Sequence, residues 1–410
     1  MKKIQITVLA FALVSVFGCQ KSFTVSNNSD ASRQSIGFNA FTHLTKASAI
    51  LGEEGARGGN FKMAAFQMSG TAEGTGVTAT PYFTNDFGYG INSAFPSAWN
   101  TSTTQYWPAT TVTELTTESV ASESLSFFSY GPTSADGKFS ITFDDNNYDG
   151  AQNRTLPKLT VSVAAANADQ KDILAAMTEF NHWEDNNKVS INYNHILSAI
   201  TFSAKTESAG FKFIVDEIIV GVANNDISTG SLYPTGVYEF AKDNEKGNWT
   251  GQTGTKEKYN VVLGSATAIT KELTADVTTS LPLSASNGIL MLIPQQLNIL
   301  NNDAYFYVKY KSYKKNEDGV SYETTPRNYT KFAPLHITGM TEWKAGKKYN
   351  YVLNLADLDK KPIEYNVTVS VWDDWDSTTP TADVEIDFQN EVSSNSLPVF
   401  EEGTEFETSW

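Results

Sequence analysis

The sequence is poor in cysteine and in basic residues, and it lacks long helical segments. Its 410 residues contain 1 cysteine, which excludes internal disulfide bonds and cysteine-based metal sites. Lys and Arg number 30 against 46 Asp and Glu, and the net charge of −16 argues against a nucleic-acid partner. Long runs of helix-forming residues at helical spacing are missing, while aromatic residues make up 12% of the chain. This composition predicts an all-β protein.

Residues suited to catalysis or metal binding are also scarce. The chain has 4 histidines, and none stands in a metal-ligand spacing or near a nucleophilic serine motif. The sequence fingerprints of hydrolases, phosphate-binding loops and zinc proteases are missing. His195 falls in an apolar strand, and we interpret it as a core histidine. We therefore predict that the protein is not an enzyme and that it needs no cofactor.

One polar segment partly matches the sequence pattern of a metal-binding loop. Asp145, Asn147, Asp149 and Gly150 match the first six positions of a calcium loop, with oxygen ligands at positions 1, 3 and 5 and glycine at position 6. Position 12 is Leu156, where a bidentate Glu is needed. The same residue types are typical of a hairpin turn, which is the interpretation we prefer. Asp145, Asn147 and Asp149 are kept as a weak calcium candidate only.

The single cysteine, Cys19, follows a segment that is typical of a secretory signal. Two lysines follow the first methionine, residues 4–17 are almost wholly apolar, and Gly18 is a small residue just before the cysteine. The sequence VFGC resembles a bacterial lipobox, which predicts cleavage before Cys19 and attachment of acyl chains to it. An ordinary signal peptide with an incidental cysteine is the weaker interpretation.

Strand signals separated by turn residues recur along the rest of the chain. We predict a lipoprotein signal peptide over residues 1–18 and a polar tether over 19–34. Two β-sandwich domains are predicted over residues 35–187 and 188–380, with the polar break HWEDNNK at their boundary. Residues 381–410 remain as a C-terminal tail.

Two segments near opposite ends of the chain share the alternation of a half-buried strand. In SIGFNAF, Ile36, Phe38 and Ala40 fall on one side. In ADVEIDF, acidic residues alternate with an apolar face made of Ala382, Val384, Ile386 and Phe388. A glycine-rich segment that contains Arg57 follows the first of these strands, and it is predicted to be an exposed loop.

Nine segments, taken in order, point to a known family. They are SIGFNAFTHLTKAS, YWP, LSFFSYGP, KDILAAM, VSINYNHILSAITFSAK, VDEIIVGV, LMLIPQQ, WKAGKKYNYVLNL and VTVSVWDDW. Each is a weak motif by itself, but their order and spacing over nearly the whole chain resemble the fimbrillins, the FimA/Mfa-type major and minor pilins of Bacteroidales. The resemblance implies two tandem transthyretin-like Greek-key β-sandwich domains.

The resemblance also implies a function. It implies a structural pilin subunit of a type V-like fimbrium that supports adhesion, exported as a lipoprotein and anchored in the outer membrane through the lipid on Cys19. A trypsin-like surface protease would remove residues 35–57, with Arg57 as the candidate cleavage site and Lys46 as the second choice. The partners would be other fimbrial subunits, and no nucleic acid is expected.

The resemblance assigns matching roles to the two alternating segments. Ile36, Phe38 and Ala40 would belong to the leaving strand, and the donor strand of a neighbouring subunit would carry Ala382, Val384, Ile386 and Phe388. Two simpler interpretations stay open. Arg57 can be an ordinary surface-loop residue, and ADVEIDF can be the last strand of its own sandwich.

A second function class remains as the alternative. The chain could be a cell-surface glycan-binding lipoprotein of a polysaccharide uptake system, with Trp372 and Trp375 as a platform on which sugars stack. Tryptophans at a strand end belong more often to core packing, so we place this alternative second.

Overall fold

A computed structural model describes residues 35–42, 59–69, 78–108, 124–133, 137–148, 155–181, 188–241, 247–265, 268–271, 280–286, 288–298, 303–357, 363–371 and 384–385. Over these ranges the regular structure consists of β-strands and one 3-10 turn at Asn167–Asp169, which confirms the all-β prediction. No helix in the described ranges is long and apolar enough to cross a membrane.

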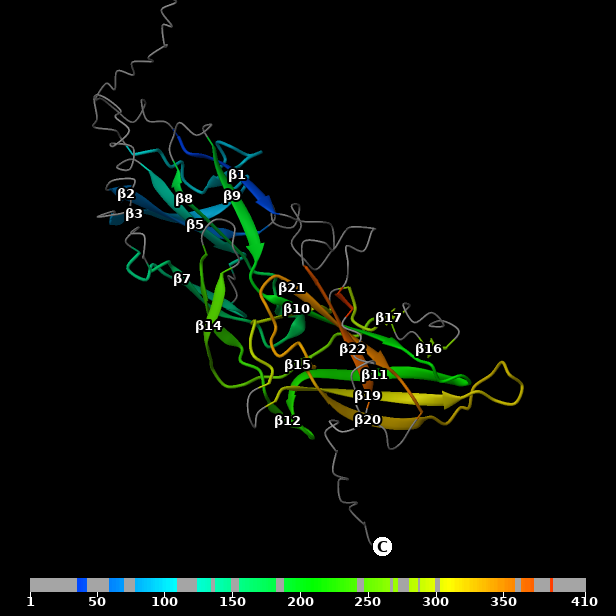
Figure 1. Cartoon of the computed structure of the whole chain (residues 1–410). Helices are drawn as coiled ribbons and strands as arrows, with labels where there is room; N and C mark the ends of the chain where they lie inside the picture. The colour runs from blue at the N-terminus through cyan, green and yellow to red at the C-terminus, as the bar shows by residue number, and fades with distance from the viewer. Residues whose placement is uncertain are drawn as a thin grey trace, which may run out of the picture.

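Seven strands form a closed barrel at one end of the molecule (Figure 1). They are β1 (Gly37–Thr42), β2 (Phe61–Ser69), β3 (Thr78–Tyr89), β4 (Trp99–Thr101), β5 (Leu125–Gly131), β8 (Leu174–Asn181) and β9 (Lys188–His195). Around the barrel the order is β1-β4-β3-β2-β5-β8-β9, and β9 closes the ring on β1. Every neighbouring pair is antiparallel except β1 and β9, which are parallel.

A four-stranded sheet packs against the outside of the barrel. Its order is β14-β13-β7-β6, formed by β6 (Ser140–Asp144), β7 (Lys158–Ser162), β13 (Thr235–Glu239) and β14 (Asn248–Thr253). Alternate residues of a strand point to opposite faces of the sheet. In β5, Phe127 therefore enters the barrel, while Phe128 packs against Tyr148 and Phe240 on the outside. Burial on both faces explains why LSFFSYG has almost no exposed residue.

Two six-stranded sheets form the rest of the molecule. The β10 sheet contains β10 (Ser198–Lys205), β17 (Leu281–Pro282), β18 (Leu290–Leu292), β21 (Lys347–Asn354), β22 (Glu364–Val371) and β23 (Val384–Glu385). The β11 sheet contains β11 (Phe211–Ala223), β12 (Asp226–Gly230), β15 (Tyr259–Asn260), β16 (Ile269–Thr270), β19 (Tyr305–Lys314) and β20 (Arg327–Pro334). Phe306 of the β11 sheet meets Phe202 and Tyr351 of the β10 sheet, with ring centroids 5.5 and 5.8 Å apart, so the two sheets share one apolar core.

Strand pairing joins the two halves of the sequence. β7 pairs with β13 from Ser162↔Thr235 to Lys158↔Glu239, and β9 pairs with β1 in the barrel. Both pairings join a residue before the predicted domain boundary, between residues 187 and 188, to a residue after it. The division of the chain into two domains at this boundary remains a prediction. In Figure 1 the four-stranded sheet lies between the barrel and the two larger sheets.

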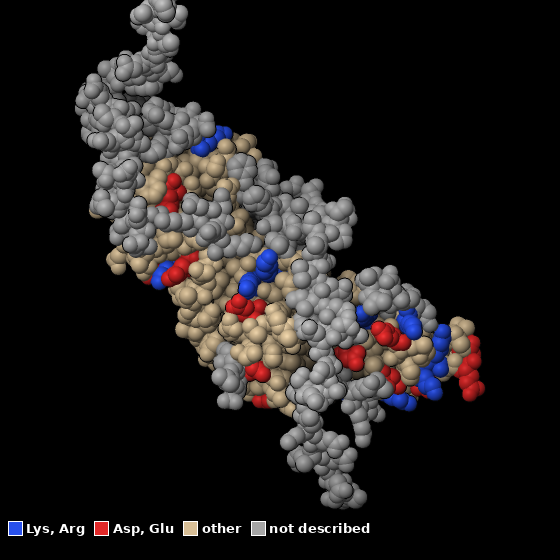
Figure 2. All heavy atoms as spheres, in the orientation of Figure 1, with Lys and Arg blue, Asp and Glu red and all other residues tan. Residues whose placement is uncertain are grey.

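Charged side chains are unevenly spread over the face shown in Figure 2. They gather at the end formed by β11, β19 and β20. The ion pair between Lys311 and Asp216, 3.0 Å apart, joins β19 to β11 in that region. Exposed pairs of this kind contribute little because their charges remain solvated, so the stability of the fold rests on its apolar core.

Candidate functional site

β1 is the strand that closes the barrel. It runs parallel to β9 over all six of its residues. On its other side it meets the short strand β4 at Phe38↔Trp99, and the Ile36 N–H donates a 2.8 Å hydrogen bond to the carbonyl of Gln105. Without β1, the strands β4 and β9 would present unpaired backbone groups along an open seam.

One face of β1 forms part of the barrel core. Ile36, Phe38 and Ala40 are 4%, 2% and 7% exposed and belong to the barrel's apolar cluster. Phe38 makes edge-to-face contacts with Phe87 and Phe127, at centroid distances of 5.2 and 5.6 Å. Full burial of such a side chain contributes about 1.5–3 kcal/mol, so β1 supplies a substantial share of the barrel's stability.

A hydroxyl pair lies beside the apolar cluster of the barrel. The oxygens of Ser129 on β5 and Tyr193 on β9 are 2.6 Å apart, and the Ser129 hydroxyl is also 2.9 Å from the carbonyl oxygen of Lys62. Burial raises the pKa of Tyr193 well above its ordinary value, against the lowering effect of the Ser129 hydrogen bond. Tyr193 therefore stays neutral and contributes a hydroxyl rather than a charge to the barrel.

The residues that sequence analysis assigned to processing flank β1 in the chain. The described residues stop at Thr42 after β1 and resume at Gly59, just before β2. Cys19, Lys46 and Arg57 lie outside the described residues, so lipidation and cleavage remain predictions.

The alternating tail segment is described at two residues only. Val384 and Glu385 form β23, which pairs antiparallel with β22 through Val369↔Val384 and Thr368↔Glu385. This is a contact of the tail with its own chain. Ala382, Ile386 and Phe388 lie outside the described residues, as does the side chain of Val384, so the donor role remains a prediction.

The weak calcium candidate takes the conformation of a tight turn. Asn146 and Asn147 both have φ of +53°, and the Tyr148 N–H bonds to the Asp145 carbonyl at 2.9 Å. The Asp145 carboxylate accepts a 3.2 Å bond from the Asn147 N–H. Asparagine is favoured at such positive φ values, which fits the hairpin interpretation. Asp149 lies outside the described residues, and no group of three metal-ligating side chains occurs among the residues that are described.

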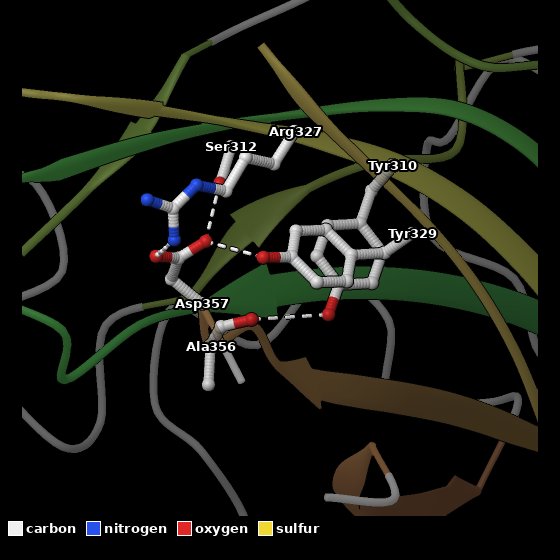
Figure 3. Close-up of polar contacts among 6 residues, drawn as sticks. All are labelled: Tyr310, Ser312, Arg327, Tyr329, Ala356 and Asp357. Carbon is white, nitrogen blue, oxygen red and sulfur yellow. Dashed lines mark hydrogen bonds and ion pairs between the residues drawn. The ribbon is translucent and has the colours of Figure 1, made fainter. Parts of the chain in front are cut away.

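A polar cluster around Asp357 was not predicted from the sequence (Figure 3). Asp357 follows β21, and its carboxylate accepts hydrogen bonds from Ser312, Tyr329 and Arg327, at 2.6 Å from Ser312 and 3.0 Å from Arg327. Tyr310, stacked on Tyr329, donates to the carbonyl of residue 356 at 3.1 Å. The cluster ties the end of β21 to β19 and β20 and therefore joins the two large sheets. No local sequence signal marks Asp357, since its partners are 28 to 45 residues away.

A second unpredicted contact is buried near the end of the barrel. His195 at the end of β9 is paired with Asp172, 2.8 Å away, and the two side chains are 3% and 0% exposed. The sequence indicated a core histidine but not its acidic partner. Trp372 and Trp375, on which the glycan-binding alternative depends, lie outside the described residues.

Comparison with known proteins identifies the family. A family model described as fimbrillin-like matches residues 56–372, which is more than half of the chain. A crystal structure of a candidate cell-adhesion protein from Bacteroides uniformis has 14% identity and a TM-score of 0.42, covering 83% of this chain and 99% of that one. The tip fimbrial protein Mfa3 from Porphyromonas gingivalis has 9% identity and a TM-score of 0.34, covering 77% of this chain and 94% of that one. No functionally curated protein matches. On the evidence of the family model, the chain belongs to the fimbrillin-like family.

Proposed function

We propose that the chain is a structural subunit of a surface fimbrium that polymerises by donor-strand exchange. Its family supports a fimbrial or adhesion subunit at the cell surface. The observation that supports the proposed mechanism is that β1 closes the barrel between β4 and β9. Phe38 and Ala40 of β1, with Ile36 just before it, fill part of the barrel core. The candidate cleavage residue Arg57 follows in the chain before β2.

The physics of the barrel supports an exchange of strands. Loss of β1 would open an apolar trough where Ile36, Phe38 and Ala40 were buried and would leave the β4 and β9 backbones unpaired. Both costs are removed when another strand of the same alternation enters the seam. The new strand restores the backbone hydrogen bonds, while its alternating side chains refill the trough.

The remaining details of the proposal come from the family resemblance. The subunit is exported as a lipoprotein anchored in the outer membrane through Cys19. It has two tandem transthyretin-like domains, and a trypsin-like protease cuts at Arg57 or Lys46. The donor face is Ala382, Val384, Ile386 and Phe388 of the next subunit. The lipid anchor would thus mark the unpolymerised precursor.

Electron microscopy of protease-treated protein tests the proposal. Trypsin treatment of the full-length precursor should produce filaments, and mass spectrometry should find Gly58 at the new N-terminus. Arg57→Gln should prevent both, while Lys46→Gln should leave both unchanged. The reverse result would assign the cleavage to Lys46, the second choice. Cleavage without filaments, or filaments from protein lacking residues 382–410, would overturn the mechanism.

A further inference from the structure

We propose that the donor strand enters the barrel in one register, with Ile386 in the place of Ile36 and Phe388 in the place of Phe38. The strand would run parallel to β9, as β1 does. This inference rests on the proposed function, but it names the two side chains that carry recognition and the direction of the strand.

The site of Phe38 is built for an aromatic ring. Phe87 and Phe127 meet Phe38 edge to face, and all three side chains are at most 2% exposed. A smaller side chain at this position would leave a cavity between the two rings and lose their edge-to-face contacts.

The chain beyond residue 381 offers four aromatic residues for this site, namely Phe388, Phe400, Phe406 and Trp410. The residues two positions before them are Ile386, Pro398, Thr404 and Thr408. Phe388 is therefore the one that repeats the Ile-x-Phe order of Ile36 and Phe38. Because this order has a direction, the match also requires the donor to run the same way as β1.

Shifted registers fit the barrel less well. With Ile386 in the place of Phe38, the aromatic site is underfilled, and Phe388 must enter the small site of Ala40. With Ile386 in the place of Ala40, Val384 must fill the aromatic site of Phe38 and leaves it underfilled. Overfilling and underfilling a packed core are both destabilising.

The pairing of β23 supports the same register independently. Val384 and Glu385 pair with β22 of their own chain. A donor segment that begins at Ile386 can enter a neighbouring barrel without breaking this pairing. A register that uses Val384 as a donor residue requires Val384 to give up its backbone pairing with Val369 of β22.

The register also puts a polar residue into the site that Ala40 occupies in the precursor. Asn390 would take the place of Ala40, whose partner in the β1–β9 register is Ile191. The next residue of β9 on the same face is Tyr193, hydrogen-bonded to Ser129. A hydrogen bond from the Asn390 amide to this hydroxyl pair would lower the cost of burying the amide there.

A pair of alanine variants separates this register from its neighbours. Phe388→Ala should reduce the amount of filament formed after cleavage by more than about tenfold, because it removes the side chain that fills the aromatic site. Leu397→Ala, a matched control at an apolar tail residue outside the proposed donor face, should change it by no more than about twofold. The reverse order of effects would overturn the register.

Engineered disulfides then report the register directly, in a full-length Cys19→Ala background that has no other cysteine. Asn39 and Ser190 are partners in the β1–β9 register, and Ser190 is exposed. Asn39→Cys with Ser190→Cys should cross-link within the uncut monomer, which verifies the geometry. Gln389 replaces Asn39 in the proposed register, so Gln389→Cys with Ser190→Cys should link neighbouring subunits into a ladder after cleavage.

The same assay distinguishes failure of the register from failure of the mechanism. A ladder from Asp387→Cys with Ser190→Cys, and not from Gln389→Cys, would overturn the register while leaving donor-strand exchange intact. Absence of filaments from the cleaved parent protein would overturn the proposed function itself.

Discussion

The described residues contain two parallel strand pairs, and these pairs are held in different ways. In the barrel, β1 lies beside β9 and buries one face only. In the body made of the two large sheets, β10 lies beside β21 over eight residue pairs, and all but its last residue are buried. Thr201 and Ser203 of β10 also donate to the side-chain oxygen of Asn350 on β21, at 3.2 and 3.1 Å.

The contrast shows what makes a strand replaceable. β1 contributes one apolar row and a backbone, both of which another strand with the same alternation can supply. β10 contributes two packed faces and hydroxyl groups whose partners are fixed on β21. A polar contact of the second kind specifies one sequence, whereas an apolar row specifies only size and spacing.

The largest effect should come from removing one aromatic side chain in each region. Phe202→Ala in β10 should lower the free energy of unfolding by about 3–5 kcal/mol. Phe38→Ala in β1 should lower that of the precursor by a similar amount, because both rings are nearly fully buried. Denaturant unfolding measures each loss in the precursor. In assembled filaments β1 has been replaced, so only Phe202→Ala should lower the stability of the subunit. An equal loss of stability with Phe38→Ala would remove the contrast between the two strands.

Locking each strand pair should affect assembly in opposite ways. The Asn39→Cys/Ser190→Cys disulfide holds β1 in the barrel, so cleaved protein should form no filaments until a reductant is added. Thr201→Cys with Asn350→Cys locks β10 to β21 and should leave assembly intact. Filaments from the oxidised β1-locked protein would show that β1 need not leave. Electron microscopy before and after reduction provides the measurement.

A smaller effect is expected from the cluster that joins the large sheets. Asp357→Ala removes the acceptor of Ser312 and Tyr329 and should cost about 1–3 kcal/mol for the buried donors left without it. The loss should be measured by denaturant unfolding, with Asp303→Ala as a control at an acidic residue outside the cluster. Assembly after cleavage should persist, since the barrel is untouched, and its loss would mean that the two regions are coupled.

The smallest effect concerns the ionisation of tyrosines. Burial raises the pKa of Tyr349 in the body from 10.0 to about 12, and it also raises that of Tyr193 in the barrel. Because the folded protein holds these protons more tightly than the unfolded chain, their stabilising contribution is complete below pH 10 and is lost as the pH rises through the folded-state values.

Absorbance titration of tyrosinate can compare the two regions. In a cleaved subunit that also lacks residues 382–410, the barrel stays open, and Tyr193 should ionise nearer its ordinary value. Tyr349 should be unchanged. An unaltered titration curve after β1 has been released would show that the barrel closes over the empty seam.

Much of the fold could be predicted from the sequence, because all-β composition and alternation are local signals. The pattern of SIGFNAF locates Ile36, Phe38 and Ala40 on one face without any structural information. The aromatic pair around Phe38 could not be predicted, because Phe87 and Phe127 come from separate strands that only the barrel brings together. The same holds for Asp357, whose hydrogen-bond partners are fixed by the packing of one sheet on another.

The place of β1 in the barrel, away from the β10 sheet that the tail follows, has a consequence for the symmetry of an assembly. Under the proposed exchange, each subunit gives a strand from the tail that follows its β10 sheet and receives one in its barrel, so giving and receiving surfaces differ. Such a contact is heterologous, and when the rotation between successive subunits does not close a ring it generates an open fibre with two unlike ends. A subunit without residues 382–410 can receive but cannot give. Mixed in small amounts with intact subunits, it should act as a chain terminator, and mean filament length should fall in inverse proportion to its fraction.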